Sequence, residues 1–207
     1  MKDLLLLNSS LYKGSAVLGL LNFSPKYVVM LIGVTGVFGS GKSTVAKMLA
    51  KSMHYRLIDA DRLAKGVRKK RNGEIRKAFG TADTKKLAEI VFRDEEKLRK
   101  LEEIIHPKVL ANMKKLSMGK DSVLDLPLLF ESGYQKVVDK IIVVRCAERV
   151  RIKRLLKKGF TAKNILWRTS HQMTIKKKIL CADYVVDNSK SKEETEKQVN
   201  ALCTALG

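Results

Sequence analysis

The chain has 207 residues, of which 45% are apolar, a composition typical of a globular protein and a length that suits one α/β domain with insertions. Its formal net charge of +21 indicates anionic partners such as nucleotides, nucleic acid or a membrane surface. Its three cysteines are scattered without a CxxC pair, which argues against a disulfide framework or a zinc site and favours a reducing, cytoplasmic location.

The excess positive charge is confined to two segments of the chain. Residues 62–120 hold 18 Lys and Arg against 8 Asp and Glu, and residues 145–178 hold 12 against 1. A solvated, lysine-rich surface explains most of these cations. The confinement to two segments predicts that the remainder bind phosphate groups.

Residues 1–29 are predicted to be an N-terminal extension. Their apolar runs are short, and none approaches the roughly 20 apolar residues that a transmembrane helix needs. A signal peptide is disfavoured because Asp3 lies in the part that should be basic and no clear cleavage site follows. Because Met30 directly precedes the first predicted strand, translation from Met30 is the alternative to an extension that is part of the native protein.

A glycine-rich loop joins the first predicted strand to the first predicted helix. Residues 28–34 form an apolar strand, residues 33–44 read GVTGVFGSGKST, and residues 43–53 have the apolar spacing of a helix. The loop matches the P-loop pattern GxxxxGK[ST], and the strand and helix beside it are the context that this motif requires.

The residue types of this loop fit a polyphosphate. Glycines at 36, 39 and 41 allow backbone N–H groups to point at an anion, and the helix N-terminus adds partial positive charge. Lys42 is predicted to reach the β- and γ-phosphates, and the Ser43 hydroxyl to hold Mg²⁺. The predicted nucleotide-binding residues of the loop are Gly36, Gly39, Ser40, Gly41, Lys42, Ser43 and Thr44.

Two carboxylates follow the second predicted strand, residues 55–58. Carboxylates at the carboxyl end of a parallel strand point into the crevice where such sheets bind ligands. One of them can instead cap the next helix. We assign Asp59 mainly to the cap and Asp61 mainly to chemistry.

Residues 62–118 lack strand alternation and are predicted to form helices with basic faces. The His106-Pro107 pair is predicted to interrupt them, because proline disfavours helical geometry in the residue before it and is tolerated in a first turn. His106 therefore lies at a predicted element boundary, where a capping or packing role is the alternative to ligand binding.

The third and fourth predicted strands are residues 122–125 and 140–144, the latter β-branched and apolar like a central parallel strand. Asp125 ends the third strand, where P-loop enzymes carry a carboxylate for Mg²⁺ or its water. A basic helix over residues 145–158 and a second one reaching to about residue 181 follow. A strand over residues 184–186 and a helix over residues 193–206 close the chain.

Five strands separated by helices predict an α/β fold of the P-loop NTPase type, a doubly wound parallel sheet between layers of helices. The two basic segments are insertions that lie over the P-loop at the carboxyl edge of the sheet, as in a phosphotransferase with an acceptor site and a lid over ATP. The expected division of residues 30–207 is a core of residues 30–61, 119–145 and 179–207, an acceptor-binding helical insertion of residues 62–118, and a lid of about residues 146–178.

Five stretches in one order resemble a known family. They are the P-loop, the Asp59-Ala60-Asp61 triplet, IIHP at residues 104–107, DLPLLFE at residues 125–131 and ADYVVDNS at residues 182–189. Together they resemble the dephospho-CoA kinase family over about residue 30 to the C-terminus, and the last two stretches are quite specific to it.

The resemblance implies a reaction and its cofactors. ATP with Mg²⁺ would phosphorylate the ribose 3′-hydroxyl of dephospho-CoA, the last step of coenzyme A synthesis. It implies Asp61 as catalytic base, and Lys42 and Arg154 as stabilisers of the phosphoryl group. The further residues that it implies for ATP are Arg154, Lys158 and Asn188, those for the acceptor are Asp61, His106, Pro127, Leu128 and Phe130, and those for the metal are Ser43 and Asp125.

The lid departs from the family pattern RLxxRDG, because residues 154–159 read RLLKKG. Lys158 replaces the arginine and the aspartate is absent, so the bidentate fork of arginine is lost; Arg154 or Arg168 are candidates to replace it. The segment between Gly80 and Leu87 is also shorter than is usual in the family.

Two alternatives remain at the level of sequence. One is another P-loop nucleoside or nucleotide kinase. The other is a basic P-loop protein that binds nucleic acid, which the net charge favours but the 6% aromatic content does not. We expect a monomer with no membrane partner and only nonspecific, salt-sensitive binding to nucleic acid.

Overall fold

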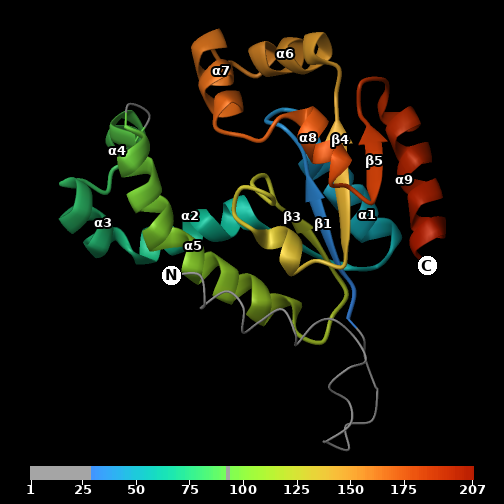
Figure 1. Ribbon diagram of the computed structural model, residues 1–207, viewed down its shortest axis with the longest axis horizontal. Coiled ribbons are helices and arrows are strands. Elements are labelled where there is room, and N and C mark those ends of the chain that lie inside the picture. The colour runs from blue at the N-terminus through green and yellow to red at the C-terminus, as the bar shows by residue number, and fades with distance from the viewer. Residues whose placement is uncertain (1–28, 92–93) are drawn as a thin grey trace, which may run out of the picture.

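The computed structural model describes residues 29–91 and 94–207 (Figure 1). The predicted N-terminal extension, residues 1–29, lies outside the described part apart from Val29. No helix in the described part is long and apolar enough to cross a lipid bilayer. The cysteines at 146, 181 and 203 are all free.

The centre of the fold is a five-stranded sheet in the order β2-β3-β1-β4-β5, in which every pairing is parallel. This confirms the predicted fold class. The strands are β1 (Leu31–Thr35), β2 (Arg56–Asp59), β3 (Ser122–Asp125), β4 (Lys140–Arg145) and β5 (Tyr184–Asp187). The register pairs Asp125 with both Val34 and Asp59, so the carboxyl ends of β1, β2 and β3 lie side by side.

Helices cover both faces of the sheet, which is why the central strands are apolar on both sides. On one face, Val123, Ile142 and Val144 pack against α1 (Lys42–Ser52) and α9 (Lys192–Leu206). On the other face, Leu124 and Val143 pack against α2 (Ala60–Lys70) and α5 (Glu95–Ser117). Alternate residues of one strand thus enter opposite cores, as the pleat requires.

In the described part of the segment between β2 and β3, four helices extend to one side of the sheet (Figure 1). They are α2 (Ala60–Lys70), α3 (Asn72–Phe79), α4 (Thr84–Val91) and α5 (Glu95–Ser117). A separate apolar cluster of Ile75, Leu87 and Val91 holds α3 and α4 against α5. This segment coincides with the predicted acceptor-binding insertion.

The prediction that His106-Pro107 interrupts the helices, with His106 at an element boundary, was wrong. Helix α5 runs through Pro107 without a break. Proline inside a helix costs roughly 3 kcal/mol. Ile105, Val109 and Met113 are buried against the sheet side of α5, and each such side chain contributes about 1.5–3 kcal/mol. Three buried anchors therefore outweigh the proline.

Three helices lie between β4 and β5, and α6 and α7 stand over the carboxyl ends of the strands (Figure 1). They are α6 (Glu148–Lys157), α7 (Ala162–Ser170) and α8 (Ile175–Leu180). The prediction of a single helix reaching to about residue 181 was wrong, because residues 171–174 are not helical and separate α7 from α8. Gln172 and Met173 bond to other segments there, and Thr174 caps α8 through the N–H of Lys177. A short 3₁₀ helix, Tyr134–Lys136, precedes β4.

Candidate active site

The glycine-rich loop connects β1 to α1 and positions the start of that helix. Gly41 has φ 92°, and a Cβ placed on it would lie 1.9 Å from the Asn188 amide nitrogen. That nitrogen donates to the Ser40 backbone carbonyl at 2.8 Å, and the Thr195 hydroxyl donates to the side-chain Oδ1 of Asn188 at 3.1 Å. No side chain caps α1. The Thr44 N–H donates to the Gly41 carbonyl at 2.9 Å, so the first-turn amides that remain available to an anion are those of Lys42 and Ser43.

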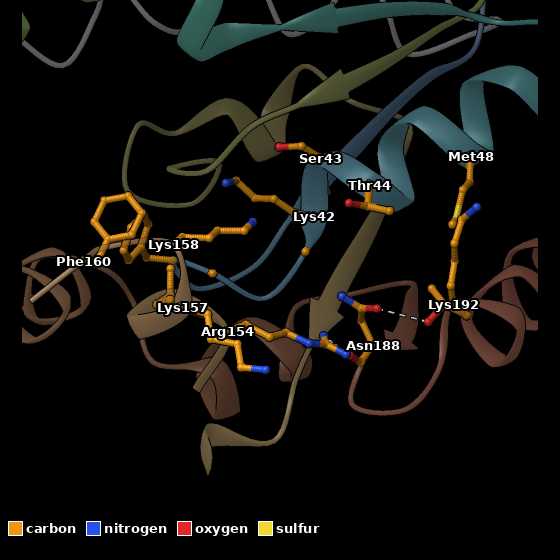
Figure 2. A pocket seen from close by; sticks show the side chains of 15 residues that line it. Lys42, Ser43, Thr44, Met48, Arg154, Lys157, Lys158, Phe160, Asn188 and Lys192 are labelled. Carbon is orange, nitrogen blue, oxygen red and sulfur yellow. Dashed lines mark hydrogen bonds between the residues drawn. The ribbon is translucent and has the colours of Figure 1, made fainter. Parts of the chain in front are cut away.

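A first pocket of about 640 Å³, here the donor pocket, opens beside this helix start (Figure 2). It is lined by Ser43 and Thr44 of α1, by lid residues and by Asn188. Its cations come from three different segments and are Lys42, Arg154, Lys157, Lys158 and Lys192. Convergent cations at a helix N-terminus suit a polyphosphate.

A second pocket of about 700 Å³, here the acceptor pocket, lies on the other side of Lys42. Asp61, His106, Pro127 and Leu128 line it, so the structure brings together these four predicted residues. Lys42 and the neighbouring Phe38 line both pockets. The P-loop lysine therefore stands where the contents of the two pockets would meet.

Three carboxylates lie at the carboxyl edge of the sheet, at the ends of β2 and β3 and in the first turn of α2. Asp59 accepts a hydrogen bond from the Arg62 N–H at 2.9 Å and caps α2, as predicted. Asp61 is in the first turn of α2, exposed, and lines the acceptor pocket. Asp125 is buried at the end of β3.

The environment of Asp125 fits a metal ligand. Burial raises the pKa of its carboxyl above the ordinary value, against the hydrogen bond from Ser43 and the charge of Lys42, which lower it. Its Oδ1 is buried without a hydrogen-bond partner. Magnesium ions at phosphate sites take one or two protein oxygens and complete their shell with water and phosphate. The described residues hold no cluster of three or more His, Cys, Asp or Glu that would bind a metal unaided.

Three contacts fix the lid against the P-loop. The buried Arg151 guanidinium donates to the Phe38 carbonyl at 2.9 Å, and the Phe38 N–H donates to the Gln172 Oε1 at 2.7 Å. Leu155 of α6 packs so closely on Gly39 that a Cβ there would lie 2.6 Å from its Cδ1. The phosphate-binding loop and the lid thus pack as one unit.

The two lid cations predicted to bind ATP differ in their surroundings. The Arg154 guanidinium donates to the carbonyls of Asn188 at 2.6 Å and Lys190 at 3.0 Å, and it lies beside Asn188 in Figure 2. Lys158 is exposed at the rim of the donor pocket. Both line that pocket, and their contact with a nucleotide stays a prediction.

Some predicted residues lie behind the pocket walls. Phe130 is buried in the core, with its ring centroid 5.5 Å from the Lys178 ammonium, and lines neither pocket. Ser40 is also buried, and its N–H donates to the Val37 carbonyl. Gly36 packs on the carbonyl of Val144. These residues support the residues that line the two pockets and do not line the pockets themselves.

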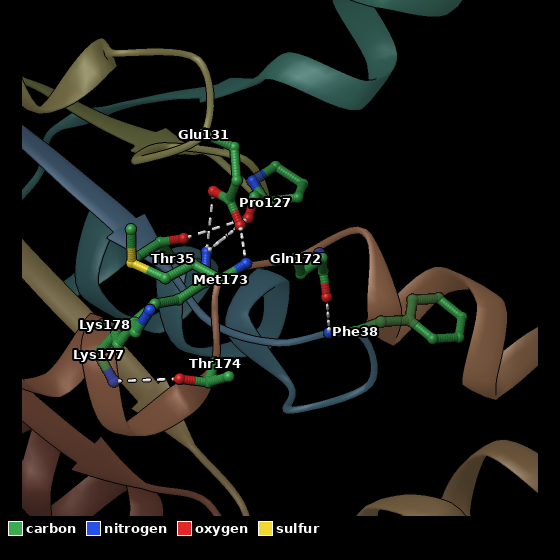
Figure 3. Close-up of polar contacts among 9 residues, drawn as sticks. All are labelled: Thr35, Phe38, Pro127, Glu131, Gln172, Met173, Thr174, Lys177 and Lys178. Carbon is green, nitrogen blue, oxygen red and sulfur yellow. Dashed lines mark hydrogen bonds and ion pairs between the residues drawn. The ribbon is translucent and has the colours of Figure 1, made fainter. Parts of the chain in front are cut away.

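One feature that the sequence did not reveal is a buried ion pair between the lid and the loop after β3 (Figure 3). The Lys178 side chain is fully buried and donates to both Glu131 carboxylate oxygens, at 2.9 and 3.1 Å. Glu131 also accepts from the Met173 N–H at 2.7 Å, and Lys178 donates to the Pro127 carbonyl at 3.3 Å. Pro127 and Glu131 both line the acceptor pocket, so this pair joins its wall to the lid.

A parallel sheet with a P-loop at its first strand, a cationic donor pocket and a carboxylate-bearing acceptor pocket define a P-loop kinase. A family model described as dephospho-CoA kinase matches residues 30–194. A dephospho-CoA kinase of Aquifex aeolicus is 43% identical over 190 residues, which cover 84% of this chain and 96% of that protein. The chain therefore belongs to the dephospho-CoA kinase family.

Solved structures agree with this assignment. A protein from Thermus thermophilus superposes with a TM-score of 0.76 at 33% identity, over 86% of this chain and 98% of its own. A dephospho-CoA kinase from Campylobacter jejuni does so with a TM-score of 0.64 at 26% identity, over 85% of this chain and 96% of its own.

Proposed function

We propose that this protein transfers the γ-phosphoryl group of ATP to the ribose 3′-hydroxyl of dephospho-CoA and so forms coenzyme A and ADP. Family membership supports the substrates. The observation that carries the mechanism is the meeting of the two pockets at Lys42, with Asp61 on the acceptor side.

In the proposed step, the ribose oxygen forms a bond to the γ-phosphorus while the bond from that phosphorus to the bridging oxygen of ADP breaks. The hydroxyl proton passes to the carboxylate of Asp61, which is exposed to the acceptor pocket. Lys42 and the amides at the start of α1 stabilise the negative charge of the phosphates. Arg154, Lys158 and Asn188 hold ATP from the lid side of the donor pocket.

Magnesium is the metal that this chemistry requires, and it neutralises charge on the phosphates when bound. Ser43 and Asp125 would hold it, because a hydroxyl and a carboxylate oxygen without a partner lie together behind the P-loop. The four residues lining the acceptor pocket, Asp61, His106, Pro127 and Leu128, would contact dephospho-CoA. Phe130 would support this wall from the core.

The proposal also covers the location of the protein in the cell, its oligomeric state and the use of its two insertions. Its three unpaired cysteines favour the reducing cytoplasm. We expect it to act as a monomer and to use its insertion of residues 62–118 for the acceptor and its lid of about residues 146–178 for ATP.

The experiment is a coupled assay of ADP release with Mg·ATP and a panel of acceptors. Dephospho-CoA is expected to be turned over, and AMP, UMP and uridine are expected to be used far more slowly. Equal or faster turnover of a nucleoside monophosphate would assign the protein to the nucleotide kinases instead.

A further inference from the structure

The cations that line the acceptor pocket come from two sides of it. Lys42 belongs to the P-loop, and the central guanidinium carbon of Arg168 lies 5.0 Å from the ring centroid of Phe38 in the same loop. Arg99 lies on α5, and among the described residues it is the cation that the helical insertion contributes to this pocket. A negatively charged acceptor that extends away from the P-loop therefore meets Arg99.

Arg99 and the proposed base lie near opposite ends of one wall of the pocket. The wall is one face of α5, formed by residues 98, 99, 102 and 106. His106 marks the end near Asp61, because both also line a side crevice of about 70 Å³ that Arg99 does not line. Arg99 precedes His106 by seven residues, which is about 10 Å along the helix axis at a rise of about 1.5 Å per residue. The pocket thus extends along α5 from the base to Arg99.

The Arg99 guanidinium faces the His106 end of the wall and has unused donors. Its Nε lies 4.0 Å from Oε1 of Glu103, one turn further along α5, so the side chain runs toward His106. That distance is too long for a hydrogen bond, and within residues 29–91 and 94–207 no acceptor receives one from Arg99. The two side chains are 72% and 68% exposed, so their ion pair is weak and a phosphate group can replace it.

The carboxylates of the pocket limit where a phosphate group can lie. Asp61 and Glu102 line the wall on the base side of Arg99, and Glu131 is neutralised by Lys178 at 2.9 Å. Like charges repel a phosphate, whereas the planar fork of an arginine matches its oxygens. The Arg99 end of the wall is therefore the favourable place for a phosphate group other than the one being transferred.

The proposed acceptor carries such a group. Dephospho-CoA has a diphosphate on the 5′-carbon of the ribose whose 3′-hydroxyl is to be phosphorylated, so the two groups lie only a few bonds apart. With the 3′-hydroxyl at Asp61, the diphosphate has to lie along the α5 wall, within reach of a long side chain that extends from Arg99 toward it.

We propose that Arg99 binds the 5′-diphosphate of dephospho-CoA and so selects an acceptor that carries a diphosphate over a bare nucleoside. This inference rests on the proposed function, because it names a contact of that acceptor. Arg99 stays protonated throughout, and no bond forms or breaks at it.

The test compares kcat and KM for dephospho-CoA in wild type, Arg99→Ala, Arg99→Lys and the control Lys100→Ala, all in the full-length protein. Lys100 is the next residue of α5, is exposed and lines neither pocket, so Lys100→Ala removes the same charge from the same helix. Loss of one charge-assisted contact at an exposed site should raise KM about 10-fold in Arg99→Ala. The contact is equal in ground state and transition state, so kcat should stay near wild type. Arg99→Lys should be intermediate, and Lys100→Ala should match wild type.

Adenosine separates recognition of the diphosphate from a general defect. It has the same base and ribose without the diphosphate, so wild type should use it far more slowly than dephospho-CoA, and Arg99→Ala should use it as wild type does. An unchanged KM for dephospho-CoA in Arg99→Ala would overturn the proposal. An equal loss with both acceptors, or an equal loss in Lys100→Ala, would also overturn it, since the effect would then not depend on the diphosphate or on Arg99.

Calorimetric binding of dephospho-CoA without ATP distinguishes this inference from the proposed function. If wild type binds dephospho-CoA and does not phosphorylate it, the proposed function fails. A dissociation constant raised about 10-fold in Arg99→Ala and unchanged in Lys100→Ala would still support the contact, and an unchanged constant in Arg99→Ala would reject it. A wild type that does not bind dephospho-CoA would overturn both.

Discussion

Breaking the buried ion pair from its acidic side should destabilise the protein more than breaking it from its basic side. Glu131→Gln leaves the Lys178 ammonium, which has no exposed surface, with the Pro127 carbonyl at 3.3 Å and a neutral amide as its neighbours. Lys178→Met leaves the carboxylate of Glu131, whose side chain is 20% exposed and which still accepts from the Met173 N–H. Water can reach the Glu131 carboxylate that Lys178→Met leaves unpaired, but it cannot reach the Lys178 ammonium that Glu131→Gln leaves unpaired.

The magnitudes follow from this difference. An uncompensated buried charge costs about 3–5 kcal/mol of unfolding free energy, which we expect for Glu131→Gln. Lys178→Met leaves a carboxylate that water can reach and that keeps one hydrogen bond, so we expect the smaller cost of a group that has lost a partner, about 1–3 kcal/mol. The double variant has no buried charge, so it should be more stable than Glu131→Gln alone.

The deficit of Glu131→Gln should also depend on pH. Burial lowers the pKa of Lys178, and the hydrogen bond and charge of Glu131 work against that shift, while Lys42 adds to it. Without Glu131 the pKa of Lys178 should fall further. Between that lowered value and the ordinary lysine value the unfolded chain binds more protons than the folded one, so stability rises with pH there. The deficit relative to wild type should therefore shrink as the pH is raised above neutrality.

The assay is urea unfolding followed by circular dichroism for wild type, both single variants and the double variant, at neutral and alkaline pH. A larger loss in Lys178→Met than in Glu131→Gln would refute the argument from burial. So would a double variant that is no more stable than Glu131→Gln.

Three further predictions concern the active site, the N-terminus and the surface charge. Asp61→Asn should lower turnover by about 10²–10⁴-fold with ATP affinity little changed, and Asp59→Asn should lower it less; steady-state kinetics giving the reverse order would exchange their roles. Deleting residues 1–29 should preserve folding and activity, because β1 begins at Leu31 and Met30 can still donate to Asp121; a truncated protein without a cooperative melt would contradict this. Binding to heparin or DNA should weaken by orders of magnitude between low and physiological salt, and sequence-selective binding at physiological salt would contradict a nonspecific origin.

Much of the fold follows from the sequence because its signals are local. The P-loop motif and the apolar runs of the strands can be recognised from neighbouring residues alone. Apart from the start of β1, both ends of each strand lie within a residue or two of the predicted bounds. Asp59 is a cap because the chain next to it turns directly into α2. The helix through Pro107 was missed because its stability comes from burial against distant segments, which local spacing does not report.

The structure of the lid was harder to predict because its residues contact residues that are distant in the sequence. Arg151 looks like one more cation of a solvated helix, yet it is buried against the P-loop. Its position four residues before the buried Leu155 is the signal that places it on the inner face. For Lys178 and Glu131, 47 residues apart, nothing local predicted the pair.

The central claim is the transfer of the γ-phosphoryl group of ATP to one hydroxyl of dephospho-CoA. The most direct measurement is ³¹P NMR of the product that wild type forms from dephospho-CoA and Mg·ATP, with Lys42→Ala as the inactive control. A new phosphomonoester on the ribose 3′-oxygen, identical to coenzyme A and absent with Lys42→Ala, is the predicted result. A phosphate on another oxygen, or none at all, would contradict the account.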